Sequence, residues 1–184
     1  MSSEITILLE RYREGDGAAI DELARLIYPE LKAMARRRSR NDLKLGATTL
    51  VNETFLKLLS GGMLRPADRQ QFFGLAATIM RQVIVDEVRY VSAAKRSADE
   101  VTFSDTRQPD ESREKAEFLL QVDRILDQLL AENPMLAKVF ECRYFAGFTT
   151  AETAEALSTS ERSVERFWAE ARERIAALMS DTTR

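Results

Sequence analysis

The sequence of 184 residues contains no histidine and a single cysteine, Cys142. Histidine is the commonest general base and the commonest metal ligand, so its absence argues against a metal site, a haem site or another bound cofactor. A single cysteine cannot form an internal disulfide, which favours a reducing compartment. We therefore expect a cytoplasmic protein without cofactors, in which Cys142 is a thiol of the core.

Long apolar runs are also missing. No stretch approaches the ~20 apolar residues that a membrane span needs, and the N-terminal residues are too acidic for a signal peptide. A hydrophobic content of 45% with 31% charged residues is instead typical of a soluble globular protein. We expect no contact with a membrane.

Residues that carry chemistry are sparse. The carboxylates within clearly apolar helical stretches are Glu53, Asp86 and Glu87. No base, nucleophile or phosphate-binding loop accompanies them. Asp86 has a structural interpretation, as a buried partner of Arg37 or Arg89. The sequence therefore favours a protein that is not an enzyme.

The longest regular stretch runs from Gln70 to Arg96 and contains no proline. Its apolar residues recur at spacings of three and four, which predicts one long helix with a wide buried stripe. Arg81 and Arg89 fall on the polar face of that helix. The same spacing predicts helices elsewhere, at residues 5–14, 18–38 (with a kink or a new start at Pro29, near Tyr28), 49–59, 118–130, 135–145, 149–157 and 161–179.

Residues 97–114 break this periodicity. They are rich in serine, threonine, aspartate and glutamate and include Pro109, so we expect a flexible acidic linker. The predicted fold is all-α, with two small helical domains at residues 1–96 and 117–184 joined by a linker at 97–116. The first would resemble a helical bundle and the second a helix-turn-helix.

Two features indicate nucleic-acid binding. The helix at 149–157, the turn Ser158–Ser160 and the helix at 161–179 have the layout of a helix-turn-helix, with Val164 and Phe167 packing back onto the first helix. Residues 32–44 carry six basic side chains against one acidic. Such a cluster is either a phosphate-binding patch or a solvated helix end.

Three motifs point to one family. They are LVNETFLKLL (residues 50–59), FFGLAATIMRQVIVDEVRYVSAAKR (72–96) and SERSVERFWAEARERI (160–175). With these motifs in this order, the sequence resembles the bacterial RNA polymerase sigma factors of the extracytoplasmic-function (ECF) group over nearly its whole length. The resemblance implies an alternative sigma factor that binds core RNA polymerase and directs promoter-specific transcription initiation.

The resemblance also implies roles for particular residues. Those expected to bind polymerase are Leu50, Asn52, Glu53 and Phe55. Those expected at the −10 element, where the loop at 61–69 would help to hold a flipped base, are Phe72, Phe73, Arg81, Arg89, Lys95 and Arg96. Those expected to read the −35 element in the major groove are Arg162, Ser163 and Arg166. The plainer alternative is that Arg162 and Arg166 pair with neighbouring glutamates on a solvated helix.

One departure from the family pattern suggests a control mechanism. The family usually has acidic residues before the polymerase-binding helix, whereas here residues 46–49 carry two hydroxyls, those of Thr48 and Thr49. A phosphate on either threonine would restore negative charge at the start of that helix. Our hypothesis is that a Ser/Thr kinase phosphorylates one of them and switches on polymerase binding. Simple N-capping by an unmodified threonine is the alternative.

Two other classes of protein stay open at this point. One is a self-contained helix-turn-helix regulator, which would bind DNA without polymerase. The other is a helical protein that binds and sequesters a partner and has no affinity for DNA. An anti-sigma factor is a further possible partner, as the alternative to a kinase for holding the chain inactive.

Overall fold

The computed structural model describes residues 2–39, 45–60, 66, 68–99 and 111–182. The described residues form helices and no strand, so the prediction of an all-α fold is confirmed. In chain order the elements are α1 (Ser2–Arg13), α2 (Ala18–Ser39), α3 (Ala47–Ser60), α4 (Arg69–Asp99), α5 (Glu111–Glu132), α6 (Pro134–Phe140), the π-helix η1 (Glu141–Phe145), α7 (Thr150–Ala156) and α8 (Glu161–Thr182).

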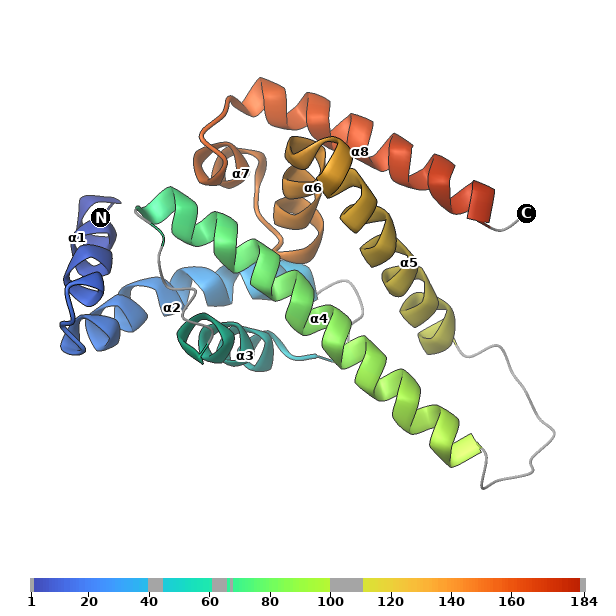
Figure 1. Cartoon of the computed structure of the whole chain (residues 1–184), viewed down its shortest axis with the longest axis horizontal. Helices are drawn as coiled ribbons and strands as arrows, with labels where there is room; N and C mark the ends of the chain where they lie inside the picture. The colour runs from blue at the N-terminus through green and yellow to red at the C-terminus, as the bar shows by residue number, and fades with distance from the viewer. Residues whose placement is uncertain (1, 40–44, 61–65, 67, 100–110, 183–184) are drawn as a thin grey trace.

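The long helix α4 lies with α1–α3 on one side and α5–α8 on the other (Figure 1). We refer to α1–α4 as the first half of the chain and to α5–α8 as the second half. Helix α4 packs against α1 and α3 of the first half and against α5, η1 and α7 of the second. Its apolar stripe supplies several of the largest fully buried side chains, among them Phe72, Ile79, Met80 and Ile84. Because both halves cover it, α4 is buried over more of its circumference than a one-sided amphipathic helix.

Two helix starts in the first half differ from the prediction. Helix α2 continues through Pro29 to Ser39, so a new start near Tyr28 is wrong. Buried Leu23, Ile27 and Leu31 lie on both sides of the proline and hold the two parts on one core. Helix α3 begins at Ala47, and the Leu50 N–H donates to the Gly46 carbonyl at 3.0 Å.

Both ends of the predicted linker are helical. Helix α4 continues to Asp99 and α5 begins at Glu111, so helices take both ends of the segment 97–116. Ser97, Ala98 and Asp99 include neither glycine nor proline, so nothing in them ends the helix. The rest of the predicted linker, at 100–110, lies outside the described residues.

In the second half, helix α6 begins with a clear cap. The Asn133 side chain accepts from the Leu136 N–H at the start of α6, and Pro134 occupies the first turn. The regular helix predicted for 135–145 is wrong in its last five residues, which form the π-helix η1. A π-turn of this kind adds a residue to the turn and shifts the direction of the side chains that follow.

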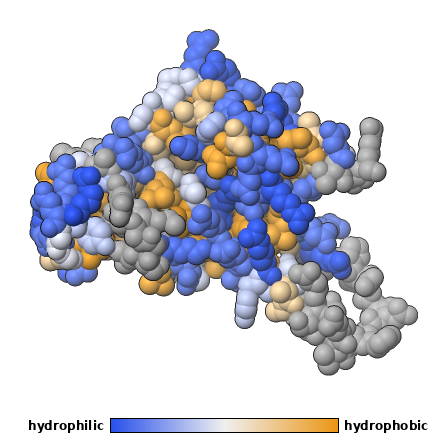
Figure 2. Space-filling view, in the orientation of Figure 1, coloured by the Kyte–Doolittle hydropathy of each residue, from blue (hydrophilic) through white to orange (hydrophobic). Residues whose placement is uncertain are grey.

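The face of the molecule in Figure 2 is mostly hydrophilic, with apolar residues visible in scattered patches. Exposed apolar groups in small patches are normal for a globular protein. Across the described ranges, no helix has the length and the apolar character needed to cross a membrane.

Candidate functional site

Helices α7 and α8 form a capped pair joined by a tight turn. At the start of α7, the Glu152 N–H donates to the Thr149 hydroxyl at 3.2 Å and the Thr149 N–H donates to the Glu152 carboxylate at 2.7 Å. This reciprocal capping box fixes where α7 begins. Between the helices, Ser158 has a φ of 50°, in the left-handed region, and reverses the chain. The predicted helix, turn and helix are therefore present.

The first turns of α8 present basic side chains to solvent. Arg162 and Arg166 are exposed, and Ser163 is half-buried. The Ser163 N–H donates to the Ser160 hydroxyl at 3.1 Å, which makes Ser160 the cap of this helix. The structure thus brings the three residues expected at the −35 element together on one short surface.

The alternative role for these arginines is not observed. Within the described chain, neither Arg162 nor Arg166 pairs with Glu161, Glu165 or Glu170; the Arg166 guanidinium instead lies 4.8 Å from the centre of the Phe167 ring. Their charge is therefore available to a ligand.

The opposite face of α8 is held in the core of the second half. Val164 is fully buried beside Ala154 of α7, as the sequence predicted. The Trp168 ring lies 5.3 Å from the Phe140 ring, and the Arg143 guanidinium lies 5.6 Å from the centre of the Trp168 ring. Because this face is fixed, the first turns of α8 keep one orientation. We call this exposed basic surface, with Arg162, Ser163 and Arg166, the front of α8.

Helix α3 carries the residues expected to bind polymerase, but on two different faces. Leu50 is buried in the core and Phe55 is half-buried, whereas Asn52 and Glu53 are exposed. Leu56, one turn beyond Asn52, is 58% exposed. Sequence reasoning missed Leu56, although its spacing from Asn52 and Glu53 already placed it on their face of the helix.

Thr48 and Thr49 lie within the first turn of α3 and are exposed. The alternative interpretation, that an unmodified Thr48 or Thr49 is the N-cap, is wrong because the helix begins earlier, at Ala47. Their hydroxyls are nevertheless close to the positive end of the α3 dipole, where an anion is favoured.

The aromatic pair at the start of α4 is buried. Phe72 and Phe73 pack edge to face at 5.3 Å, and Phe73 also meets Phe148 of the second half at 6.3 Å. The Arg69 guanidinium lies 4.6 Å from the centre of the Phe73 ring. In this arrangement the two phenylalanines expected at the −10 element face protein on all sides.

Arg81 is the most heavily paired residue of α4 in the described structure. Its guanidinium donates to Asp123 at 2.8 Å, to Glu141 at 2.8 Å and to Asp127 at 2.6 Å. Thr78 donates to the second oxygen of Glu141 at 2.8 Å. Burial disfavours the charged form of Arg81, but these hydrogen bonds outweigh it and raise the pKa of the guanidinium above its ordinary value. Arg81 therefore stays charged inside the protein.

The other basic residues expected at the −10 element differ in exposure. The Arg89 side chain is 59% exposed and donates to Asp123 at 3.0 Å. Its second partner, Asp86, is exposed and also pairs with Lys57, so the expectation of a buried Asp86 is wrong. The side chains of Lys95 and Arg96 lie outside the described residues, as does most of the loop at 61–69.

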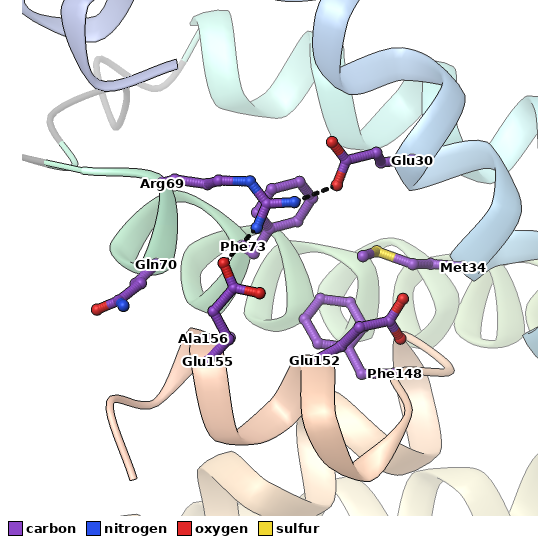
Figure 3. Close-up of a pocket in the computed structure, with 9 residues that line it drawn as sticks. All are labelled: Glu30, Met34, Arg69, Gln70, Phe73, Phe148, Glu152, Glu155 and Ala156. Atoms are coloured by element: carbon purple, nitrogen blue, oxygen red, sulfur yellow. Dashed lines mark hydrogen bonds and ion pairs between the residues drawn. The ribbon is translucent and has the colours of Figure 1, made fainter. Parts of the chain in front are cut away.

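Further ion pairs join the two halves near the start of α4. Figure 3 shows Arg69 between Glu30 of α2 and Glu155 of α7, with both pairs drawn. The surrounding hollow encloses about 50 Å³, far less than a small-molecule site needs. Arg37 pairs with Glu152 of α7 at 2.6 Å rather than with Asp86. This region is an interface between the halves and not a ligand pocket.

No group of three or more side chains able to hold a metal ion occurs in the part of the chain that the structure describes. Cys142 is buried, as predicted.

Comparison with known proteins gives one family. The family model described as ECF sigma factor matches residues 2–181. None of the curated proteins matches the sequence.

Proposed function

Because the chain belongs to the ECF sigma factor family, whose members direct transcription initiation with core RNA polymerase at promoter DNA, we propose that it is an alternative sigma factor acting at its own set of promoters. The observation that carries this proposal is the front of α8. There Arg162 and Arg166 are exposed and without a glutamate partner on their helix, while the back of the helix is fixed in the core.

The second half would read the −35 element. The α7–α8 pair has the layout of a helix-turn-helix, in which the first residues of the second helix reach base edges in the major groove. Arginine donates two hydrogen bonds to guanine, which is the commonest specific contact in that groove. In this assignment Arg162 and Arg166 read bases, and Ser163 contacts a base or a phosphate.

The first half would bind polymerase through α3 and read the −10 element through α4. Asn52, Glu53 and Leu56 form the exposed face of α3, where a polar rim surrounds one apolar side chain, as in many protein interfaces. Leu50 and Phe55 support this face from the core side.

At the −10 element, Phe72 and Phe73 would hold a flipped base. Arg81, Arg89, Lys95 and Arg96 would contact phosphates, which position a protein on DNA without reading its sequence. Such a protein would act in the cytoplasm, without a cofactor.

Phosphorylation of Thr48 or Thr49 is the control mechanism that we favour. Both are exposed in the first turn of α3, directly beside its outward face. A phosphate there would add about −1.5 to −2 charges at the positive end of the helix dipole and could pair with basic groups of polymerase. The partner that this mechanism requires is a Ser/Thr kinase. An anti-sigma factor that covers α3 or α8 is the alternative form of control.

The test is run-off transcription with purified core polymerase on a genomic promoter library. We expect transcripts that depend on this chain and that share two short sequence elements upstream of their starts. A self-contained regulator would bind DNA in the absence of polymerase, and a sequestering protein would give no transcripts and no salt-dependent DNA binding. If the chain, with glutamate at both threonine positions, neither co-migrates with core polymerase nor supports transcription, the proposal is wrong.

A further inference from the structure

The second half of the chain covers the face of α4 that is expected to meet DNA. Phe73 packs against Phe148, and the Ser158 hydroxyl donates to the Gln70 side chain at 2.7 Å. A side chain at Gly74 would place its Cβ 3.5 Å from the Ala156 carbonyl oxygen, so the two backbones lie close together there. The contact between the halves thus extends along the first turns of α4.

Arg81 continues this contact toward the middle of the helix. Its side chain is 7% exposed, and those of Asp123 and Glu141 are 11% and 4% exposed. The three carboxylates that pair with Arg81 all come from the second half: Asp123 and Asp127 from α5, and Glu141 from η1. Buried charges are stable only when they are paired and hydrogen-bonded. The second half therefore supplies an acidic site that matches the arginine of the first.

A DNA phosphate would make the same kind of contact. Carboxylates and phosphates both accept paired hydrogen bonds from a guanidinium, so they compete for one arginine. Arg81 cannot serve Asp123, Glu141 and a phosphate at the same time, because all of its donor nitrogens point at protein oxygens.

We propose that this acidic site is an autoinhibitory clasp, formed by Asp123, Asp127 and Glu141, which closes the free chain over Arg81 and Phe73 until polymerase opens it. The inference rests on the proposed function, since it names what holds the −10 surface away from DNA. In this proposal, a chain whose clasp is closed over Arg81 cannot use Arg81 to contact DNA.

The surfaces left exposed indicate what opens the clasp. In the closed form the outward face of α3, with Glu53 and Leu56, and the front of α8, with Arg162 and Arg166, stay accessible. A large partner can therefore bind the closed chain first. It shifts the chain toward the open form only if it binds that form more tightly. In the proposed function, core polymerase and the two separated promoter elements would hold the two halves apart, and they would therefore favour the open form.

A reversible lock tests the clasp. Gln70→Cys and Ser158→Cys place one thiol on each half at side chains that are in hydrogen-bond contact. A bis-maleimide linker with a central disulfide would join them in the full-length chain, while buried Cys142 stays unreacted. We expect the locked chain to lose at least ~tenfold in run-off transcription, because only the open fraction is competent. Reduction of the linker should restore transcription.

A matched control locks two helices of one half together. Glu132→Cys on α5 and Arg174→Cys on α8 replace an ion pair of 2.6 Å within the second half. The same linker there should leave transcription unchanged. If the Gln70–Ser158 linker does not form in the free chain, or if the locked chain transcribes as well as the reduced one, the clasp is wrong. If the unlocked parent chain is also inactive with core polymerase, the proposed function itself fails.

A second measurement follows opening directly and does not depend on transcription. Fluorophores on Arg25→Cys of α2 and Glu173→Cys of α8, both exposed positions, report the separation of the halves by energy transfer. We expect high transfer in the free chain, and lower transfer after core polymerase binds or after Asp123→Asn with Glu141→Gln. Glu132→Gln, on the same α5 helix, is the control and should keep high transfer. Transfer that is equal in the free and polymerase-bound chains would overturn the proposal.

Discussion

The Arg81 Nε and the Asp123 Oδ1 lie 2.8 Å apart, although 42 residues separate the two side chains in sequence. Both are buried, and they belong to different halves of the chain. The pair therefore depends on how the halves pack, in contrast to Arg113–Glu117, which one turn of helix brings together.

Replacement of Arg81 by methionine should destabilise the protein strongly. It leaves the buried carboxylates of Asp123 and Glu141 without their partner, which costs about 3–5 kcal/mol where the site stays closed. Arg174→Met, which breaks the exposed pair with Glu132, should cost less than about 1 kcal/mol. Urea unfolding followed by circular dichroism measures both values. If the two variants lose equal amounts of unfolding free energy, Arg81 is not buried in the free chain.

The helices themselves could be predicted from the sequence because their causes are local. The spacing of apolar residues defined α4 within three residues at its C-terminus and one at its N-terminus. Thr149 and Glu152 stand at capping-box spacing, and Asn133 precedes a proline, so the starts of α7 and α6 could be located. The turn before α8 could be predicted because its three residues, Ser158–Ser160, are short and polar.

The environment of Arg81 could not be predicted in the same way. The helical pattern put Arg81 on the polar side of α4, and on an isolated helix that side faces water. It is buried here because Asp123 and Glu141, 42 and 60 residues away, come from elements that fold over it. No periodicity within one helix reports such a contact. The π-helix η1 could not be predicted either, because its residues have the composition of an ordinary helix.

The exposed face of α3 gives a prediction that separates binding from folding. Leu56→Ala should weaken the affinity for core polymerase by roughly 1–2 kcal/mol, as expected for an apolar residue central to an interface. It should leave the free energy of unfolding nearly unchanged, because Leu56 is 58% exposed. Leu58→Ala, two residues later and fully buried, should instead cost about 2–5 kcal/mol of stability. Fluorescence anisotropy with labelled core polymerase and urea unfolding provide the two measurements, and unchanged affinity in Leu56→Ala would exclude this face.

The front of α8 should determine the −35 preference. Arg162→Ala and Arg166→Ala should each lose about 1–3 kcal/mol at the preferred −35 sequence and less at sequences altered there, because a base contact is specific. Arg174→Ala, further along the same helix and paired with Glu132, serves as the control. Transcription from a library of −35 variants measures the preference directly. A uniform loss across all sequences would instead indicate phosphate contacts.

The phosphorylation hypothesis predicts a gain of function from added charge. Thr48→Glu or Thr49→Glu should raise the affinity for core polymerase by roughly tenfold, or about 1.4 kcal/mol. Ala18→Glu adds the same charge to the first turn of neighbouring α2, at an exposed position, and should have no such effect. Treatment with a Ser/Thr kinase should reproduce the gain in the parent chain but not in a double Thr→Ala variant. If the glutamate and alanine variants bind as the parent does, the switch is excluded.

Cys142 gives a pH dependence whose sign can be worked out. Burial, and to a lesser degree the charge of Glu141, raises the pKa of its thiol above the ordinary value. Below that ordinary value, about 8.5, the thiol is protonated in both the folded and the unfolded chain, so its contribution to stability is constant. At higher pH the unfolded chain loses the proton while the folded chain keeps it, and stability falls by about 1 kcal/mol from pH 9 to 10.

The difference in unfolding free energy between the parent and Cys142→Ala isolates this dependence, because the other titrating groups are common to both chains. We expect the advantage of the parent to shrink as the pH rises from 8 to 10. The folded parent should also react with a thiol reagent only at the rate at which it unfolds, since Cys142 is 1% exposed. A difference that is constant with pH, together with rapid modification of the folded chain, would show that the thiol faces solvent and that α4 and η1 do not pack as described.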